Sequence, residues 1–319
     1  MLRVTWKVIL LSLLFIGISG VSVSAAFWDM EEHPMIHDPS MVKENDTYWV
    51  FGTGPADGNG IRVIYSNDSG YSWGEAPVIF PEPASWWSDY VPNHASNQWA
   101  PDIEYFNGRY WLYYSVSSFG SNQSLIGLLS TDSISSGNWR DDGLVTRTTT
   151  SDNYNAIDPA MIVDENGQPW LSYGSYWSGI KLTKLDPNTM KPTGTQHSIA
   201  ARPSDPEHAV EAPTITYHNG YYYLFVSFDS CCSGVNSDYK IAVGRSAQIT
   251  GPYYDKVGNS MMQGGGTILD TGNDRWIGPG HQDVYQNLII RHAYDAESNG
   301  LPRLLINDLS WDSNGWPTY

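Results

Sequence analysis

The sequence predicts an all-β fold, a single-domain five-bladed β-propeller, and three observations support this prediction. Four stretches of the 319-residue chain, and a weaker fifth, share one plan: a proline near the start, an apolar run, a turn and an aromatic strand. Asn-Gly pairs at 107–108, 166–167 and 219–220 mark tight hairpin turns, because both residue types tolerate positive φ. No stretch has a convincing amphipathic helical period. Five repeats of about four strands are typical of a propeller, and a β-sandwich is the alternative.

The repeats follow one another along the chain at uneven spacing, as expected when the outer loops differ in length. The hairpins read "HDPSMVKENDTYWVFGTG" from residue 37, "WAPDIEYFNGRYWLYYSV" from 99, "DPAMIVDENGQPWLSYGS" from 158, "EAPTITYHNGYYYLFVSF" from 211 and "GHQDVYQNLIIRHAYD" from 280. A further apolar strand follows each hairpin, over 61–67, 124–131, 179–185, 239–246 and 303–308. The fifth hairpin has its turn at Asn287. A turn at 66–73, "SNDSGYSW", resembles the Asp-box turn of propeller blades.

The N-terminus predicts export. Arg3 and Lys7 precede the apolar run 8–18, and "SVSAA" offers small residues for cleavage after Ala25 or Ala26. The run is too short for a convincing membrane span, although an uncleaved anchor is the alternative. We therefore expect a signal peptide over residues 1–25, a catalytic propeller over 26–319, secretion to the extracellular space and no membrane attachment after cleavage.

Composition and charge restrict the partners. The chain has 34 acidic and 17 basic side chains, a formal net charge of -17, so nucleic acid and acidic membrane surfaces would be repelled. Its 14 Trp and 21 Tyr suit the apolar faces of neutral sugars. The two cysteines, Cys231 and Cys232, are adjacent and cannot join distant elements, which leaves a vicinal bridge or two free thiols.

Each repeat presents one residue at the same distance before its turn. Counting eight residues back from positions 46, 107, 166 and 219 gives Asp38, Trp99, Asp158 and Glu211, and His281 begins the fifth repeat. In a propeller the first strand of every blade lines the axis, so these side chains are predicted to converge at one end of the channel. Like charges gathered in a partly desolvated site cost free energy, which favours a chemical use for the three carboxylates. Glycoside hydrolysis is the chemistry that needs paired carboxyl groups and an aromatic wall.

Longer motifs support the same reading. They are "HDPSM", "WAPDIEYFNGRYWLYYSVSSFGSN", "YNAIDPA", "GSYWSGIKL", "EAPTITY", "YYYLFVSFDSCC" and "GGGTILD". With these motifs the chain resembles the endo-α-1,5-L-arabinanases of glycoside hydrolase family 43 over essentially its whole mature length. The resemblance implies a five-bladed propeller that cleaves arabinan with inversion. It also implies Asp38 as general base, Glu211 as general acid, and Asp158 as the carboxylate that raises the pKa of Glu211 and orients it.

The resemblance further implies a set of substrate-binding residues. Trp99 and Phe119 would stack on arabinose rings, although either could instead fill the core. The other implied contacts come from Asp38, Gly120, Asn155, Ala156, Ile157, Asp158, Ser175, Tyr176 and Trp177. His281 would hold one axial calcium ion together with waters, as a structural or activity-tuning site. Calcium prefers oxygen ligands, so a single imidazole is an unusual ligand set, and a histidine that only hydrogen-bonds a carboxylate is the alternative.

Three other functions remain open at this stage. An exo-acting arabinofuranosidase or xylosidase could use the same propeller with a groove blocked at one end. A non-catalytic sugar-binding propeller would not need the acids. A sialidase is suggested only by the Asp-box-like turn, and no arginine begins an inner strand to bind a carboxylate. We expect a monomer that binds arabinan polysaccharide and arabino-oligosaccharides.

Overall fold

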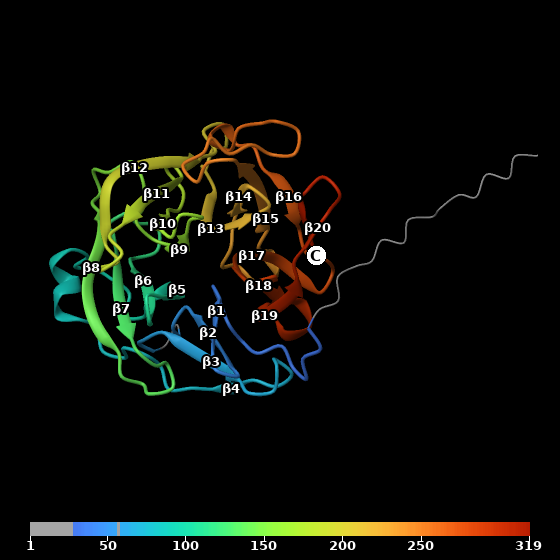
Figure 1. Ribbon diagram of the computed structural model, residues 1–319. Coiled ribbons are helices and arrows are strands. Elements are labelled where there is room, and N and C mark those ends of the chain that lie inside the picture. The colour runs from blue at the N-terminus through green and yellow to red at the C-terminus, as the bar shows by residue number, and fades with distance from the viewer. Residues whose placement is uncertain (1–27, 56–57) are drawn as a thin grey trace, which may run out of the picture.

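The computed structural model describes residues 28–55 and 58–319, and it confirms the five-bladed propeller. Five antiparallel sheets surround a central axis, with the first strand of each sheet innermost (Figure 1). The predicted signal peptide lies outside the described residues. Within those residues, the helices are four short 3₁₀ turns: η1 (Ser85–Asp89), η2 (Gly234–Asn236), η3 (Met261–Gln263) and η4 (Ala296–Ser298). No helix in this part of the chain is long and apolar enough to cross a membrane.

Each blade is one meander of strands. Blade 1 has β1 (Ser40–Glu44), β2 (Thr47–Gly52), β3 (Arg62–Ser66) and β4 (Gly74–Glu75); blade 2 has β5 (Trp99–Phe106), β6 (Arg109–Val116), β7 (Ser124–Thr131) and β8 (Arg140–Thr148). Blade 3 has β9 (Ala160–Val163), β10 (Pro169–Tyr173), β11 (Ile180–Leu185) and β12 (Pro192–Ala200). Blade 4 has β13 (Val210–His218), β14 (Tyr221–Phe228), β15 (Lys240–Ser246) and β16 (Thr267–Asp270). Blade 5 has β17 (Trp276–Tyr285), β18 (Leu288–Asp295) and β19 (Leu301–Asp308), and β20 (Ser310–Trp311) pairs with β21 (Pro317–Thr318).

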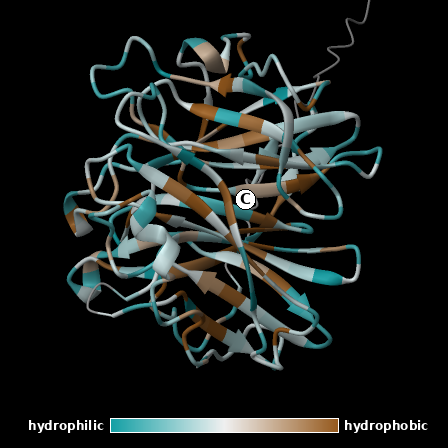
Figure 2. Cartoon of the chain, turned by 90° about the vertical axis from the view of Figure 1, so that its left-hand side faces the viewer, coloured by the Kyte–Doolittle hydropathy of each residue, from teal (hydrophilic) through white to brown (hydrophobic). Residues whose placement is uncertain are grey.

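The core lies between blades, which explains why the middle strands read as continuous apolar runs. Successive side chains of a strand point to opposite faces, and both faces of a blade are covered by neighbours. In β6, Leu112 and Tyr114 join the cluster shared with blade 1, whereas Trp111 and Tyr113 join the cluster shared with blade 3. Figure 2 shows the hydrophobic residues mainly on the strands and hydrophilic residues along the connecting loops.

The N-terminal segment closes the ring. Residues 28–36 run along β19 as the missing outer strand of blade 5, with a Met35–Arg303 bridge. Trp28 N–H donates to the Ile306 carbonyl at 3.0 Å, and Leu304 N–H donates to the Pro34 carbonyl at 2.9 Å. The last blade is therefore built from both ends of the described chain.

The hairpin turns largely follow the prediction. At 107–108 and 219–220 both residues of the Asn-Gly pair have positive φ, as a two-residue type I′ turn requires. At 166–167 only Gly167 does, because this turn is a longer loop in which Asp164 N–H donates to the Gln168 carbonyl. In blade 1 the turn begins at Asn45, which has a φ of 54°.

Candidate active site

One residue per blade adopts a left-handed conformation just before or within its innermost strand. These residues are Asp38, Ala100, Asp158, Ala212 and His281, with φ between 42° and 56°. The left-handed region is unfavourable for residues other than glycine, so five occurrences at the same place in the repeat need a cause.

The cause is an anchor on the preceding blade. The N–H of each left-handed residue donates to a side chain of that blade: Asp38 to His292 Nδ1, Ala100 to Thr53 Oγ1, Asp158 to Ser115 Oγ, Ala212 to Asp158 Oδ2 and His281 to Ser227 Oγ, all at 2.8–3.1 Å. Each inner strand is thus joined to the preceding blade by a side-chain to backbone hydrogen bond, and the left-handed residues are fixed around the axis.

This repeat corrects the predicted alignment for two residues. Trp99 and Glu211 are not equivalent to Asp38 and Asp158; the equivalent residues are Ala100 and Ala212. The count failed because the blade 1 turn starts at Asn45 rather than at position 46, and because the blade 3 loop is one residue longer. Glu211 nevertheless reaches the same end of the channel from one residue upstream, and it acts electrostatically on His281 together with Asp38 and Asp158.

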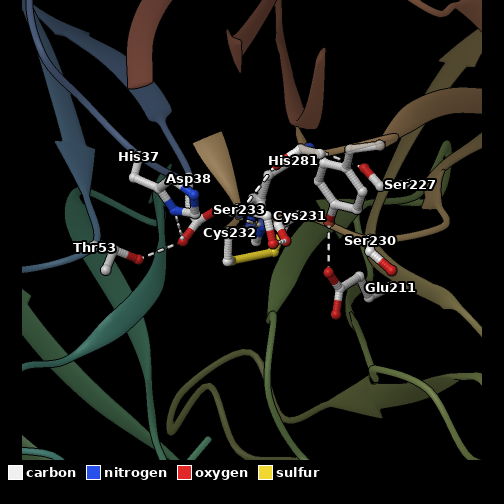
Figure 3. Close-up of a disulfide and its surroundings, with 12 residues drawn as sticks. His37, Asp38, Thr53, Glu211, Ser227, Ser230, Cys231, Cys232, Ser233 and His281 are labelled. Atoms are coloured by element: carbon white, nitrogen blue, oxygen red, sulfur yellow. Dashed lines mark hydrogen bonds and ion pairs between the residues drawn. A yellow bond between two sulfur atoms is a disulfide. The ribbon is translucent and has the colours of Figure 1, made fainter. Parts of the chain in front are cut away.

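Asp38 is held as a carboxylate by contacts on both oxygens. Oδ2 accepts from Thr53 Oγ1 at 2.5 Å and lies 2.8 Å from His37 Nδ1, while Oδ1 lies 3.1 Å from His281 Nδ1 (Figure 3). Burial alone would raise the pKa of Asp38. The charges and hydrogen bonds of His37 and His281 outweigh burial and lower the pKa well below its usual range. Asp38 is therefore ionised at neutral pH.

The pKa of Glu211 is shifted in the opposite direction. Burial raises the pKa of this carboxyl group, and hydrogen bonds from Ser175 and Tyr239 offset only part of that effect. Ser175 Oγ donates to Oε2 at 2.7 Å and Tyr239 Oη donates to Oε1 at 2.8 Å. Among the nearby carboxylates, Asp38 contributes to the rise. Burial is therefore a larger cause of the raised pKa of Glu211 than any neighbouring charge.

Asp158 is tied to the backbone beside Glu211. Its Oδ2 accepts from Ala212 N–H at 3.1 Å, which fixes the peptide that follows Glu211. Burial raises the pKa of Asp158 to about 8, with further contributions from Glu211 and Asp38, while His281 acts in the opposite direction. This geometry supports the orienting role predicted for Asp158 more directly than its predicted effect on the Glu211 pKa.

His281 has a geometry that fits a metal ligand in one respect. Burial would lower its pKa, but the charges of Asp38, Asp158 and Glu211 and the hydrogen bond to Asp38 raise it to about 9. A histidine that donates Nδ1–H to a carboxylate can present Nε2 to a metal ion only after Nε2 has lost its proton, and the raised pKa of His281 opposes that loss. Among the described residues, the one group of three ligating side chains with donor atoms close together is His37, Asp38 and His292, which does not include His281. A calcium ion at His281 would therefore take most of its oxygen ligands from water.

The predicted substrate-binding residues differ in how they are placed. Phe119 is 87% exposed, as predicted for the loop "SSFGSN", and Gly120 beside it has a φ of 77° with open space around its Cα. Trp99 is half-buried, and its Nε1 donates to Asn97 at 3.4 Å. Tyr176 and Trp177, both left-handed, follow Ser175, and the Tyr176 N–H donates to the Val210 carbonyl beside Glu211.

The segment 155–157 is buried, so its side chains are not equally available. Ala156 packs in the core between blades 2 and 3, which leaves only its backbone for a ligand. Asn155 is 3% exposed, and its Oδ1 has no hydrogen-bond partner within the described part of the chain. A buried acceptor without a partner is costly, and a sugar hydroxyl would satisfy it.

Several residues that shape the site were not predicted from the sequence. Thr53 follows β2, Tyr239 directly precedes β15 and His292 lies in β18, so counting along the first strands could not find them. His37 was within reach of the prediction, because it directly precedes Asp38 in "HDPSM". Cys231 and Cys232 form a disulfide, which decides between the two states left open above.

The comparisons with known proteins agree with this geometry. The profile of glycosyl hydrolases family 43 matches residues 34–317. An extracellular endo-alpha-(1->5)-L-arabinanase 1 of Bacillus subtilis is 62% identical over 302 residues, which cover 94% of this chain and 92% of that protein. The structure of a GH43 endo-arabinanase from Bacillus licheniformis superposes with a TM-score of 0.89 at 68% identity, covering 92% of this chain and 100% of that one. An extracellular exo-alpha-(1->5)-L-arabinofuranosidase of Cellvibrio japonicus is 42% identical over 301 residues, covering 88% of this chain and 85% of that protein.

Proposed function

Because the chain belongs to glycosyl hydrolase family 43 and is a glycosidase, we propose that it cleaves internal α-1,5-L-arabinofuranosidic bonds of arabinan with inversion of configuration. The observation that carries this proposal is a pair of buried carboxyl groups at one end of the axis whose pKa values are shifted in opposite directions. The pKa of Asp38 is lowered and that of Glu211 is raised, which are the directions that a general base and a general acid require.

The two carboxyl groups divide the reaction between them. Glu211 donates its proton to the leaving glycosidic oxygen, while Asp38 accepts a proton from the water that attacks the anomeric carbon. Asp158 keeps the backbone of Glu211 in place through Ala212 N–H. Ser175 and Tyr239 each hold one oxygen of the acid, so the proton is presented in a fixed direction.

The substrate contacts follow from exposure and geometry. Phe119 and Trp99 stack on arabinose rings, because exposed aromatic faces suit the C–H faces of sugars. Asn155 Oδ1 accepts a sugar hydroxyl, and the backbones of Gly120, Ala156 and Ile157, with Ser175, Tyr176 and Trp177, line the remaining contacts.

Stereochemistry tests the assignment of the base. If Asp38 activates water, the first product has inverted anomeric configuration and the Asp38 and Glu211 carboxyl groups stand about 6.5–9.5 Å apart in the substrate complex. NMR of the first product before mutarotation measures its anomeric configuration. A retained product would make Asp38 a nucleophile.

Product analysis on linear arabinan tests internal cleavage. An endo-enzyme releases a ladder of arabino-oligosaccharides from the first minutes. An exo-enzyme, the type for which the 42% identical relative is named, releases short products from chain ends. Asp38→Asn serves as the inactive control. Arabinose alone at the earliest time point would favour the exo alternative.

The axial calcium ion is the part of the proposal that concerns His281. An ion that binds only the folded chain stabilises it by about 2.7 kcal/mol when its free concentration is 100 times the dissociation constant. Chelation of the wild type should lower the melting temperature, calcium should restore it, and His281→Ala should respond to neither. Equal melting curves of intact and metal-stripped wild type would reject the ion and leave the carboxylate mechanism unchanged.

Secretion and a monomeric state complete the proposal. The 62% identical relative is named as extracellular, and the vicinal disulfide is compatible with an oxidising compartment. N-terminal sequencing of the exported protein should find a start near residue 26, and light scattering should give the mass of one chain.

A further inference from the structure

A disulfide-closed turn stands beside the catalytic carboxyl groups, and the mechanism above does not use it. Cys231 and Cys232 lie between β14 and β15, with Cys231 half-buried and Cys232 exposed. Figure 3 shows the disulfide among the labelled side chains of Asp38, His281 and Glu211. The position of this turn in blade 4 is at the same end of the molecule as Glu211, since β14 runs back from the turn at 219–220.

The turn is held in one conformation by its own hydrogen bonds. Ser230 N–H donates to Asp238 Oδ1 at 2.8 Å, and Ser233 N–H donates to Ser237 Oγ at 3.1 Å. Cys232 between them has a φ of 67°. A left-handed residue other than glycine costs about 1–2 kcal/mol, and the covalent ring of the disulfide adds to these hydrogen bonds in restricting this peptide.

From this peptide a row of hydrogen bonds leads to the catalytic base. Cys232 N–H donates to Tyr294 Oη at 2.7 Å, and that oxygen lies 2.9 Å from His37 Nε2. His37 Nδ1 lies 2.8 Å from Asp38 Oδ2. When His37 Nδ1 faces the carboxylate, Nε2 faces the Tyr294 hydroxyl, which can donate a hydrogen bond or accept one.

We propose that the disulfide-closed turn is a positioning element for the base: its peptide N–H holds Tyr294, and Tyr294 holds the His37 ring against the carboxylate. The inference rests on the role of Asp38 proposed above. His37 is otherwise free to turn about its side-chain bonds, since its second polar contact is the Tyr294 hydroxyl. The His292 ring stacks on it at 4.0 Å between centroids and restricts its tilt, but stacking does not select which nitrogen faces Asp38.

The role predicts a kinetic effect that a purely structural contact would not have. Tyr294→Phe removes the hydroxyl and keeps the ring, so kcat on linear arabinan should fall about 10-fold while KM changes less than about 2-fold. Tyr253→Phe is the matched control, because Tyr253 is equally buried and its Oη donates to the Ile249 carbonyl at 2.7 Å, away from the site. This control should keep both constants.

Reduction tests the disulfide itself. Dithiothreitol transfers two electrons and two protons to the Cys231–Cys232 bond and closes into its own cyclic disulfide. Thiol titration should then find two thiols per chain, since the chain has two cysteines. Reduced wild type should lose kcat to the level of Tyr294→Phe, whereas reduced Tyr294→Phe should lose nothing further, because both changes break the same row of bonds.

The Cys231→Ser, Cys232→Ser double variant repeats the reduced state without reagent, and its melting temperature shows that it folds. The positioning role would be overturned if reduction lowered kcat further in Tyr294→Phe. It would also be overturned if either reduction or Tyr294→Phe alone left kcat unchanged. A change confined to KM would mean that the disulfide contacts the sugar instead. Full activity of Asp38→Asn would reject the base, and the inference with it.

Discussion

Two clusters of buried carboxyl groups lie at two levels of the same axis, and they are held in different ways. The upper cluster is Asp38, Asp158 and Glu211; the lower cluster is Asp102, Glu104 and Asp283, from β5 and β17. Burial raises the pKa of all three lower groups, and their mutual repulsion raises those of Asp102 and Glu104 further. In the upper cluster only Asp38 departs from this pattern.

The difference lies in the partners that the two clusters have. Asp102 Oδ2 accepts from Met161 N–H and Asp283 Oδ2 accepts from Met41 N–H, both at 2.8 Å, so these side chains join neighbouring inner strands. Asp38 has two histidines within 3.1 Å. Burial without a basic partner in contact raises the pKa of a carboxyl group, whereas the imidazole rings beside buried Asp38 lower its pKa.

The largest expected contrast is in catalysis. Asp38→Asn and Glu211→Gln should each lower kcat on linear arabinan by about 100-fold or more, because each removes a proton-transfer group. Asp102→Asn is the matched substitution in the lower cluster and should keep kcat within about 3-fold, because asparagine can still accept from Met161 N–H. Initial rates measure kcat for each variant, and circular dichroism spectra check that each variant is folded. An inactive but folded Asp102→Asn protein would show that the lower cluster takes part in the chemistry.

A smaller effect concerns the pH dependence of the upper cluster. As the proposed general acid, Glu211 must be protonated, so activity should be lost as the pH rises through the raised pKa of this group. The Ser175 hydrogen bond lowers that pKa by stabilising the charged form. Ser175→Ala should therefore raise it and move the alkaline limb of the kcat profile to higher pH. A limb that moves to lower pH, or one that stays fixed, contradicts Glu211 as the acid.

The smallest effect is on stability, and its sign differs between Asp102 of the lower cluster and Asp38 of the upper cluster. Asp102 has a raised pKa in the folded state, so the folded chain binds more protons than the unfolded chain, and its contribution to stability declines as the pH rises from about 3.9 upward. Asp38 has a lowered pKa, so its contribution is present above about 3.9 and is lost as the pH falls through the folded pKa. Urea unfolding across this pH range should show a stability that declines less steeply with rising pH in Asp102→Asn than in the wild type. An identical pH slope would mean that Asp102 is ionised in the folded protein.

The sequence was sufficient for the fold and for the three carboxylates of the upper cluster. The blades were predictable because Asn-Gly turns and two-sided apolar strands are local features with few alternatives. The error at Trp99 and Glu211 came from a one-residue difference between turns, which composition does not reveal and which reverses the side of a strand that a residue faces. Thr53, Tyr239 and His292 lie in or beside later strands of their blades, away in sequence from the start of the first strands, and only the folded ring brings them to the carboxyl groups.

The closure of blade 5 by residues 28–36 gives this chain an unusual order of assembly. His33 Nδ1 contacts the Leu304 carbonyl at 2.9 Å across 271 positions of sequence. Contacts of such long range slow folding, because the loop between them must close before they contribute. Four blades can form as the polypeptide emerges, but the ring can be sealed only after the final strands have been made. Until residues 28–36 have paired with it, β19 presents an open edge, to which another strand could add. A chain shortened at its first described residues should consequently form dimers or aggregates through blade 5 before it loses its secondary structure.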